Sequence, residues 1–148
     1  MPAAEGVWWS DEPIALVTGL GSYERDAARV ALYLAEWCGA PVVLLRVRGR
    51  EKEGEEDFVR SLASELGVHV EDAGSTVTKD LPKALSSLIA RMSCQAVISS
   101  AAPGVGDRVE RSFAPRSPVR TLVVRSISEE GVPGRPRVIA VWATDGVD

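Results

Sequence analysis

The sequence contains few of the side chains that usually hold a metal ion or attack a substrate. It has one histidine, His69, and two cysteines, Cys38 and Cys94, among 148 residues. The cysteines form neither a CxxC pair nor a regular framework, so we expect reduced thiols that pack in the core at helix ends, rather than redox sensors. His69 has no cysteine or acidic cluster at ligand spacing, which favours a structural role. We therefore predict no metal site, no catalytic residues and no enzymatic activity.

The sequence also lacks an excess of one charge and long hydrophobic runs. The formal net charge is −4 with acids and bases interspersed, so there is no basic stripe to follow a nucleic-acid backbone. No apolar run reaches transmembrane length, and residues 1–12 lack the basic, apolar and small-residue succession of a signal peptide. We predict a cytoplasmic location and neither nucleic-acid nor membrane partners. The length and the hydrophobic fraction of 45% suit one water-soluble domain.

The sequence does contain a regular alternation of short apolar runs and helical patterns. Five segments have the length and composition of strands: 13–20, 41–47, 68–72, 95–100 and 119–126. Between the first four, apolar residues recur every three or four positions, as helices require. The run PVVLLRV at 41–47 hardly alternates, which is typical of a parallel strand covered on both faces.

This alternation predicts a five-stranded parallel, doubly wound sheet in a Rossmann-like three-layer α/β/α arrangement. Ligands of such sheets bind at the carboxyl ends of the strands. We divide the chain into an N-terminal extension at 1–12, an α/β domain at 13–126, and a linker with an extra strand at 127–148. That strand covers 137–146, and the sequence leaves open whether it joins its own sheet or a partner's.

Several local features complete this prediction. The charged stretch 50–57 is interpreted as the solvated entry to a helix, and Pro82 is tolerable only in the first turn of the next one. The segment 101–118 is expected to be a glycine-containing loop with a short helix. Trp8 and Trp9 are expected to fold back over the core, with a partner-binding patch as the alternative.

Three stretches, with the spacing between them, resemble the universal stress proteins: IALVTGLGSYERDAARVALYLAEWCGAPVVLLRV, GVHVEDAG and AVISSAAPGVGDRVERSFAPRSPVRTLVV. The resemblance covers about 14–125, most of the chain. It implies the adenine nucleotide alpha hydrolase-like version of the α/β fold and a role in stress response or regulation.

The resemblance also implies where a nucleotide such as ATP would bind. Family members that bind nucleotides end the first strand with an acid, a glycine and a serine, and the fourth with a methionine and a glycine, followed by further glycines. The matching positions are the candidate nucleotide-binding residues of this chain: Leu20, Gly21, Ser22, Ser99, Ser100, Gly104 and Gly106. Each also has a structural interpretation, as a helix N-cap, a strand end or a turn residue.

Two of these positions depart from the family's pattern in ways that matter physically. Leu20 cannot make the polar contact that the family's acid makes with the base and ribose end of a nucleotide. Ser100 adds a side chain where glycine lets the backbone approach the phosphates. We therefore expect a dimeric regulatory or stress-response module without catalytic activity, with an eroded nucleotide site and no cofactor. The alternative is an ATP- or AMP-binding universal stress protein.

The resemblance implies two kinds of protein partner. Family members commonly dimerise by pairing their last strands antiparallel, so we expect a homodimer through Arg120–Val124 and, in addition, an unidentified regulatory protein. An unpaired edge rich in leucine and valine is otherwise prone to association. The extra strand at 137–146 is the alternative cover for this edge.

Two further classes share the general α/β layout. A phosphoacceptor receiver domain would use Asp72 at the end of strand three, but VTGLGS supplies no acid to hold its cation and Arg125 stands where a lysine is wanted. An ATP-pyrophosphatase would need a serine-glycine-glycine loop after strand one, which TGLGS does not match.

Overall fold

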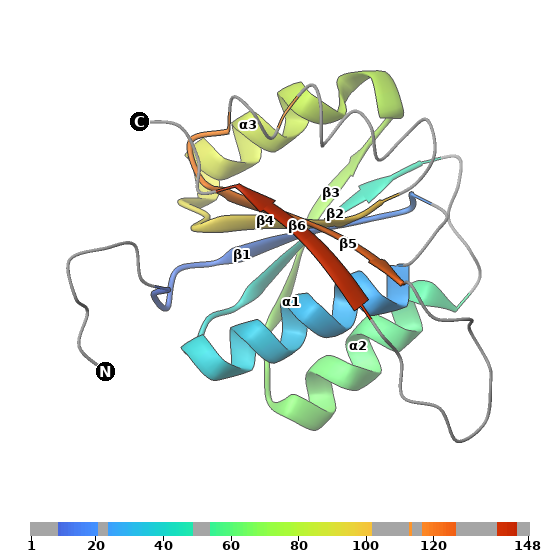
Figure 1. Cartoon of the computed structure of the whole chain (residues 1–148), viewed down its shortest axis with the longest axis vertical. Coiled ribbons are helices and arrows are strands. Elements are labelled where there is room, and N and C mark those ends of the chain that lie inside the picture. Colours follow the sequence, from blue (N-terminus) through green and yellow to red (C-terminus); the bar gives the residue numbers. More distant parts are fainter. Residues whose placement is uncertain are drawn as a thin grey trace.

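The computed structural model describes residues 9–20, 24–48, 54–101, 113, 117–126 and 139–144. Six strands in these residues form one sheet in the order β3-β2-β1-β4-β5-β6 (Figure 1). The strands are β1 (Ile14–Thr18), β2 (Val42–Val47), β3 (Val70–Thr76), β4 (Ala96–Ser100), β5 (Arg120–Ser126) and β6 (Ile139–Thr144). The helices are α1 (Glu24–Cys38), α2 (Glu55–Leu66) and α3 (Leu81–Met92), with a 3-10 turn at Thr78–Asp80.

The predicted parallel α/β arrangement is confirmed. Strands β1 to β5 pair in parallel, α1 and α2 cover one face of the sheet, and α3 covers the other (Figure 1). Successive residues of a strand point to opposite faces, so each central strand contributes to two apolar cores. In β1, Ile14 and Leu16 pack on the α1 side, while Ala15 and Val17 pack on the α3 side.

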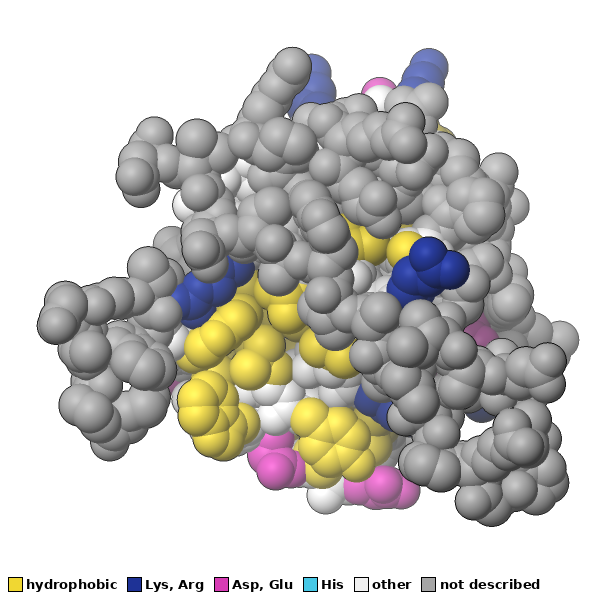
Figure 2. Space-filling view, in the orientation of Figure 1, with side chains coloured by type: hydrophobic (Ala, Val, Ile, Leu, Met, Phe, Trp, Pro, Cys, Tyr) yellow, Lys and Arg dark blue, Asp and Glu magenta, His cyan; other side chains and the backbone are white. Residues whose placement is uncertain are grey.

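Helix α1 lies close to the sheet because its inner face is built from alanine. Ala27, Ala28, Ala31 and Ala35 are all fully buried. The helix ends at Gly39, whose φ of 70° is the left-handed conformation that glycine adopts without steric cost. Leu32 is buried with these alanines, whereas Tyr33 and Trp37, the two largest apolar side chains of the helix, are exposed. Figure 2 shows hydrophobic side chains gathered on the solvent-facing surface over this helix.

Helices α2 and α3 begin as the sequence predicts. The first turn of α2 holds Glu55, Glu56 and Asp57, whose carboxylates favour the positive end of the helix dipole. Pro82 lies in the first turn of α3, where no backbone N–H donor is lost from the helix interior.

The third strand differs from the prediction, which placed it at 68–72. β3 runs from Val70 to Thr76, and His69 precedes it in an exposed position instead of lying in the strand. Gly74 has a φ of 101° and its N–H donates to Asp72 Oδ1 at 2.8 Å, so the chain makes a bulge and then pairs with β2 again. The prediction ends this strand at Asp72, whereas the ladder with β2 continues past Gly74 to Thr76.

The extra C-terminal strand joins its own sheet. β6 pairs antiparallel with β5, with Val124 opposite Val141 and Leu122 opposite Ala143. The segment Arg120–Val124, predicted as the dimerisation edge, therefore has β4 on one side and β6 on the other. A homodimer by β5 pairing is incompatible with this arrangement unless β6 is displaced.

Trp9 contacts the start of β5. Trp9 is half-buried, and the Arg120 guanidinium lies 4.4 Å from the centre of its ring. This contact agrees with the prediction that the tryptophan folds back over the domain. Trp8 lies outside the described residues, as does most of the predicted loop and short helix at 101–118, where Phe113 is buried.

Candidate functional site

Strands β1 and β4 separate at their carboxyl ends. Their ladder runs only as far as Leu16 and Ile98, whereas β1 stays paired with β2 to Thr18 and β4 with β5 to Ser100. The chain also reverses the direction in which it adds strands between β1 and β4. Open α/β sheets bind ligands at such a point, so we take the carboxyl ends of β1 and β4 as the candidate site.

Leu20, the candidate on the β1 side, is a core residue. Its side chain is 1% exposed and belongs to the apolar cluster on the α3 side, with Leu81 and Leu85. Gly19 precedes it with a φ of 88°, and a Cβ added there would lie 2.1 Å from the Val47 carbonyl oxygen. The close approach of β1 to the end of β2 therefore requires glycine. The Leu20 side chain packs in this core, which is the physical reason why it offers no polar group to a nucleotide.

Ser99 and Ser100, the candidates on the β4 side, are fully buried. Because side chains alternate along a strand, Ser99 shares the α3 side with Val97 and Ser100 shares the α1 side with Ile98. Neither hydroxyl has a hydrogen-bond partner in the part of the chain that the structure describes. A buried hydroxyl without a partner costs free energy, so the end of β4 is the least satisfied polar position of the described core.

The structure thus brings together three of the seven candidates, Leu20, Ser99 and Ser100, at the carboxyl edge of the sheet. The other four lie outside the described residues: Gly21, Ser22, Gly104 and Gly106. The sequence missed Gly19, although a glycine directly after an apolar strand is a recognisable signal for a close backbone approach.

Next to this edge, the first turns of α1 and α2 are joined through their side chains. Arg25 Nε lies 3.3 Å from Glu55 Oε1, and the guanidinium groups of Arg25 and Arg29 lie 4.9 Å and 5.0 Å from the centre of the Phe58 ring. Arg29 also pairs with the buried Asp26 at 3.0 Å. Both arginines are therefore engaged with carboxylates of the chain itself.

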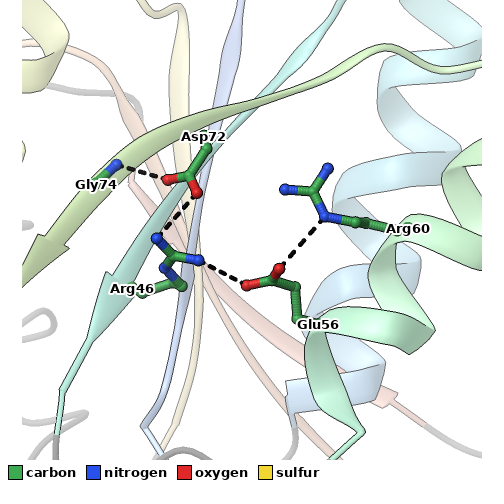
Figure 3. Close-up of polar contacts among 5 residues, drawn as sticks. All are labelled: Arg46, Glu56, Arg60, Asp72 and Gly74. Carbon is green, nitrogen blue, oxygen red and sulfur yellow. Dashed lines mark hydrogen bonds and ion pairs between the residues drawn. The ribbon is translucent and has the colours of Figure 1, made fainter.

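A second group of charges links α2 to the outer strands (Figure 3). Arg46 Nη1 donates to Glu56 Oε1 at 2.7 Å and Arg46 Nη2 pairs with Asp72 Oδ2 at 2.9 Å, while Arg60 Nε lies 3.4 Å from Glu56 Oε2. The hydrogen bond between Arg46 and Glu56 raises the pKa of the guanidinium and lowers the pKa of the carboxyl. Sequence spacing reveals only the Glu56–Arg60 pair.

This network also argues against the receiver-domain alternative. That alternative needed Asp72 at the end of the third strand, free to accept a phosphoryl group. Asp72 instead lies inside β3, where its carboxylate accepts from Gly74 and pairs with Arg46 (Figure 3). The expectation of Asp72 at a strand end is wrong because the strand continues past it.

The two cysteines lie at the opposite, amino edge of the sheet. Cys38 ends α1 and is half-buried, and Cys94 follows α3 and is buried. Burial raises the pKa of Cys38 against the opposing charge of Arg120, and burial raises the pKa of Cys94 to about 11 despite Arg91. Both groups are thus thiols at neutral pH, which agrees with the packing role predicted for them.

Within the described residues, no three His, Cys, Asp or Glu side chains are grouped closely enough to hold a metal ion. None of the described helices has the length and apolar character needed to cross a membrane.

Comparison with known proteins gives matches of structure and not of sequence. No protein-family model matches the chain, and no curated protein matches its sequence. A universal stress protein solved in complex with cAMP superposes with a TM-score of 0.56 at 13% identity, covering 76% of this chain and 95% of that one. A universal stress protein from Archaeoglobus fulgidus DSM 4304 gives 0.57 at 14% identity and covers 76% of this chain, which spans only 43% of that protein's length. At these identities the likeness concerns architecture, and the chain has the α/β fold of the universal stress proteins.

Proposed function

We propose that the chain is a non-catalytic regulatory module of stress response, which keeps the universal stress protein fold but has lost the ability to bind nucleotides. The observation that carries this proposal is the burial of Leu20. A nucleotide needs a polar contact where the family places an acid at the end of the first strand. Here that position belongs to the core on the α3 side, and its side chain is 1% exposed.

The chemistry of the other described candidates supports the same proposal. Ser99 and Ser100 are fully buried, so neither hydroxyl can reach a ligand without a movement of the residues around it. The nearby arginines at the start of α1 are paired with Asp26 and Glu55. A nucleotide phosphate would have to compete with these carboxylates, which adds a desolvation cost to binding.

A nucleotide-binding protein is the second candidate, and one observation favours it. Two buried hydroxyls without described partners lie at the switch point of the sheet, and such groups normally have a partner. A protein of the same fold was solved in complex with cAMP. On this alternative, Ser99 and Ser100 rearrange to donate to a nucleotide.

Calorimetric titration of the full chain with ATP, AMP and cAMP separates the two candidates. We expect no binding tighter than about 10 μM, equivalent to about 7 kcal/mol, and no release of phosphate during prolonged incubation with ATP. Tighter binding of any of the three would reject the proposal in favour of the alternative.

Serine variants locate any binding that is seen. If a nucleotide binds at the crevice, Ser99→Ala and Ser100→Ala should weaken it, while the matched control Ser86→Ala, at an exposed position of α3, should not. If no nucleotide binds, both β4 variants should leave the free energy of unfolding unchanged or raise it by up to about 1 kcal/mol, because an unsatisfied hydroxyl is removed.

A further inference from the structure

Helix α1 turns its largest apolar side chains toward solvent. Among the described residues, Tyr33 and Trp37 are the exposed large hydrophobic side chains, with exposed fractions of 54% and 65%. They are four residues apart and so lie on one face of the helix. Half-buried Val30 and Leu34 adjoin them on the same helix. We call these four residues the α1 flank, and Figure 2 shows the hydrophobic surface over this helix.

This distribution is the reverse of the usual one for a helix that covers a sheet. The face of α1 against the sheet is built from four alanines and Leu32, whereas the larger Tyr33 and Trp37, residue types that bury the most apolar area, are exposed. Exposed tryptophan and tyrosine on a rigid helix are the residue types that contribute most binding free energy at protein interfaces. The α1 flank therefore has the composition of a binding surface.

The charges beside the α1 flank indicate what covers it. Glu36 is exposed, directly precedes Trp37, and forms no ion pair with a described residue. The last turn of α1 contains no basic residue to balance it. One turn before Tyr33 lies Arg29, whose side chain is 36% exposed and is held in place by Asp26 and Phe58. The surface thus has the Arg29 cation at one end and Tyr33 in the middle. At the other end it has Trp37 and an anion, Glu36, without an ion-pair partner among the described residues.

Such a surface complements its own copy when two helices pack antiparallel. If a two-fold axis passes near Tyr33, the residues one turn before Tyr33 in one copy lie against the residues one turn after Tyr33 in the other copy. Both groups lie about 6 Å along the helix from the axis. Arg29 of one copy then meets Glu36 and Trp37 of the other. The chain already uses arginine on an aromatic ring in this way, with Arg120 4.4 Å from the ring centre of Trp9.

We propose that the α1 flank binds a second copy of this chain, with the two α1 helices antiparallel. The contact leaves β5 and β6 paired within each chain, so it needs no displacement of β6. Tyr33 and Trp37 lie in the second half of α1, and of the residues in this contact only Arg29 adjoins the candidate nucleotide site. A single helix pair buries less area than a standard interface, so we expect a weak dimer with a Kd of about 100 μM.

Sedimentation of the full chain between about 10 μM and 1 mM tests this proposal. The wild type should pass from monomer to dimer. Trp37→Arg should raise the dimer Kd about 30-fold, as the loss of a large aromatic contact at an interface does. Trp37→Phe should keep it within about tenfold. Because residue 37 is mostly exposed, neither variant should change the unfolding midpoint measured at low concentration.

A matched pair of charge variants tests the orientation. Glu36→Arg should weaken the dimer about tenfold, since it faces Arg29 of the other copy. Glu65→Arg changes an exposed acid in the last turn of α2 and should have no effect. The proposal is overturned if the wild type stays monomeric at the highest concentration, if Trp37→Arg associates as the wild type does, or if both glutamate variants weaken association equally.

Discussion

Gly19 and Leu20 together determine what the end of β1 can do. Gly19 allows β1 to approach the Val47 carbonyl, and Leu20 then enters the core on the α3 side. The sequence identified Leu20 as a departure from the family's pattern, because an apolar residue is visible there. The burial of Leu20 and the close approach at Gly19 could not be predicted from the sequence, because both depend on the neighbouring elements that pack around them.

Gly19→Ala should strongly destabilise the protein. The added Cβ would lie 2.1 Å from the Val47 oxygen in a backbone with a φ of 88°, so the chain has to shift. We expect the free energy of unfolding in urea to fall by about 3 kcal/mol or more.

Gly39→Ala is the matched control. Gly39 has a φ of 70° but no atom within 4 Å of the added Cβ, so only the left-handed strain remains. That strain is worth about 1–2 kcal/mol. Equal losses for the two variants would show that the approach to Val47 is not as close as described.

The ion-pair network joins α2 to β2 and β3, three elements that the sequence predicted separately. Two of its pairs, Arg46–Glu56 and Arg46–Asp72, connect residues on different elements. Only Glu56 and Arg60, one helical turn apart on α2, could be paired from spacing. The same limitation explains the error in the third strand. The predicted strand ended at Asp72, whereas hydrogen bonds to β2 on both sides of the bulge continue the strand to Thr76.

The network predicts a small dependence of stability on pH. Arg46 lowers the pKa of Glu56 in the folded state, so the stabilisation is present above the usual glutamate pKa near 4.5 and is lost as the pH falls through the lower folded value. Since the Glu56 side chain is 44% exposed, solvent screening limits the effect to a few tenths of a kcal/mol, roughly 0.5.

Glu56→Gln should therefore reduce the loss of stability between neutral and acidic pH, measured by urea unfolding at low salt. The control is Glu65→Gln, which alters an exposed residue of the same helix that forms no ion pair with a described residue. An identical pH profile for Glu56→Gln and the wild type would contradict the assignment.

The order of the strands in the sheet determines which strand edges are available for association with another chain. β6 covers the outer edge of β5, the strand expected to pair between subunits. The sequence showed both segments as strands but did not decide between pairing within and between chains, because the same hydrogen bonds form in either case.

Removal of β6 should restore an association-prone edge. A chain that ends at Ser126 exposes the N–H and C=O groups of β5, and we expect it to dimerise or aggregate through that edge. The measurement is light scattering after size-exclusion chromatography, in the Trp37→Arg background so that the α1 flank does not contribute. The full-length Trp37→Arg chain is the control and should be monomeric. A monomeric truncated chain would argue against β6 as the cover of this edge.

Local patterning alone determined the class of the fold. Apolar runs of strand length alternate with helical spacing, and that pattern has few packed solutions other than a parallel sheet with helices on both faces. Tertiary structure decided the features that depend on contacts between distant segments. These are the burial of Leu20, the unsatisfied hydroxyls of Ser99 and Ser100, the cover of β5 by β6, and the solvent exposure of Tyr33 and Trp37. Periodicity reports which residues share a face of one element, but only the neighbouring elements determine whether that face is covered.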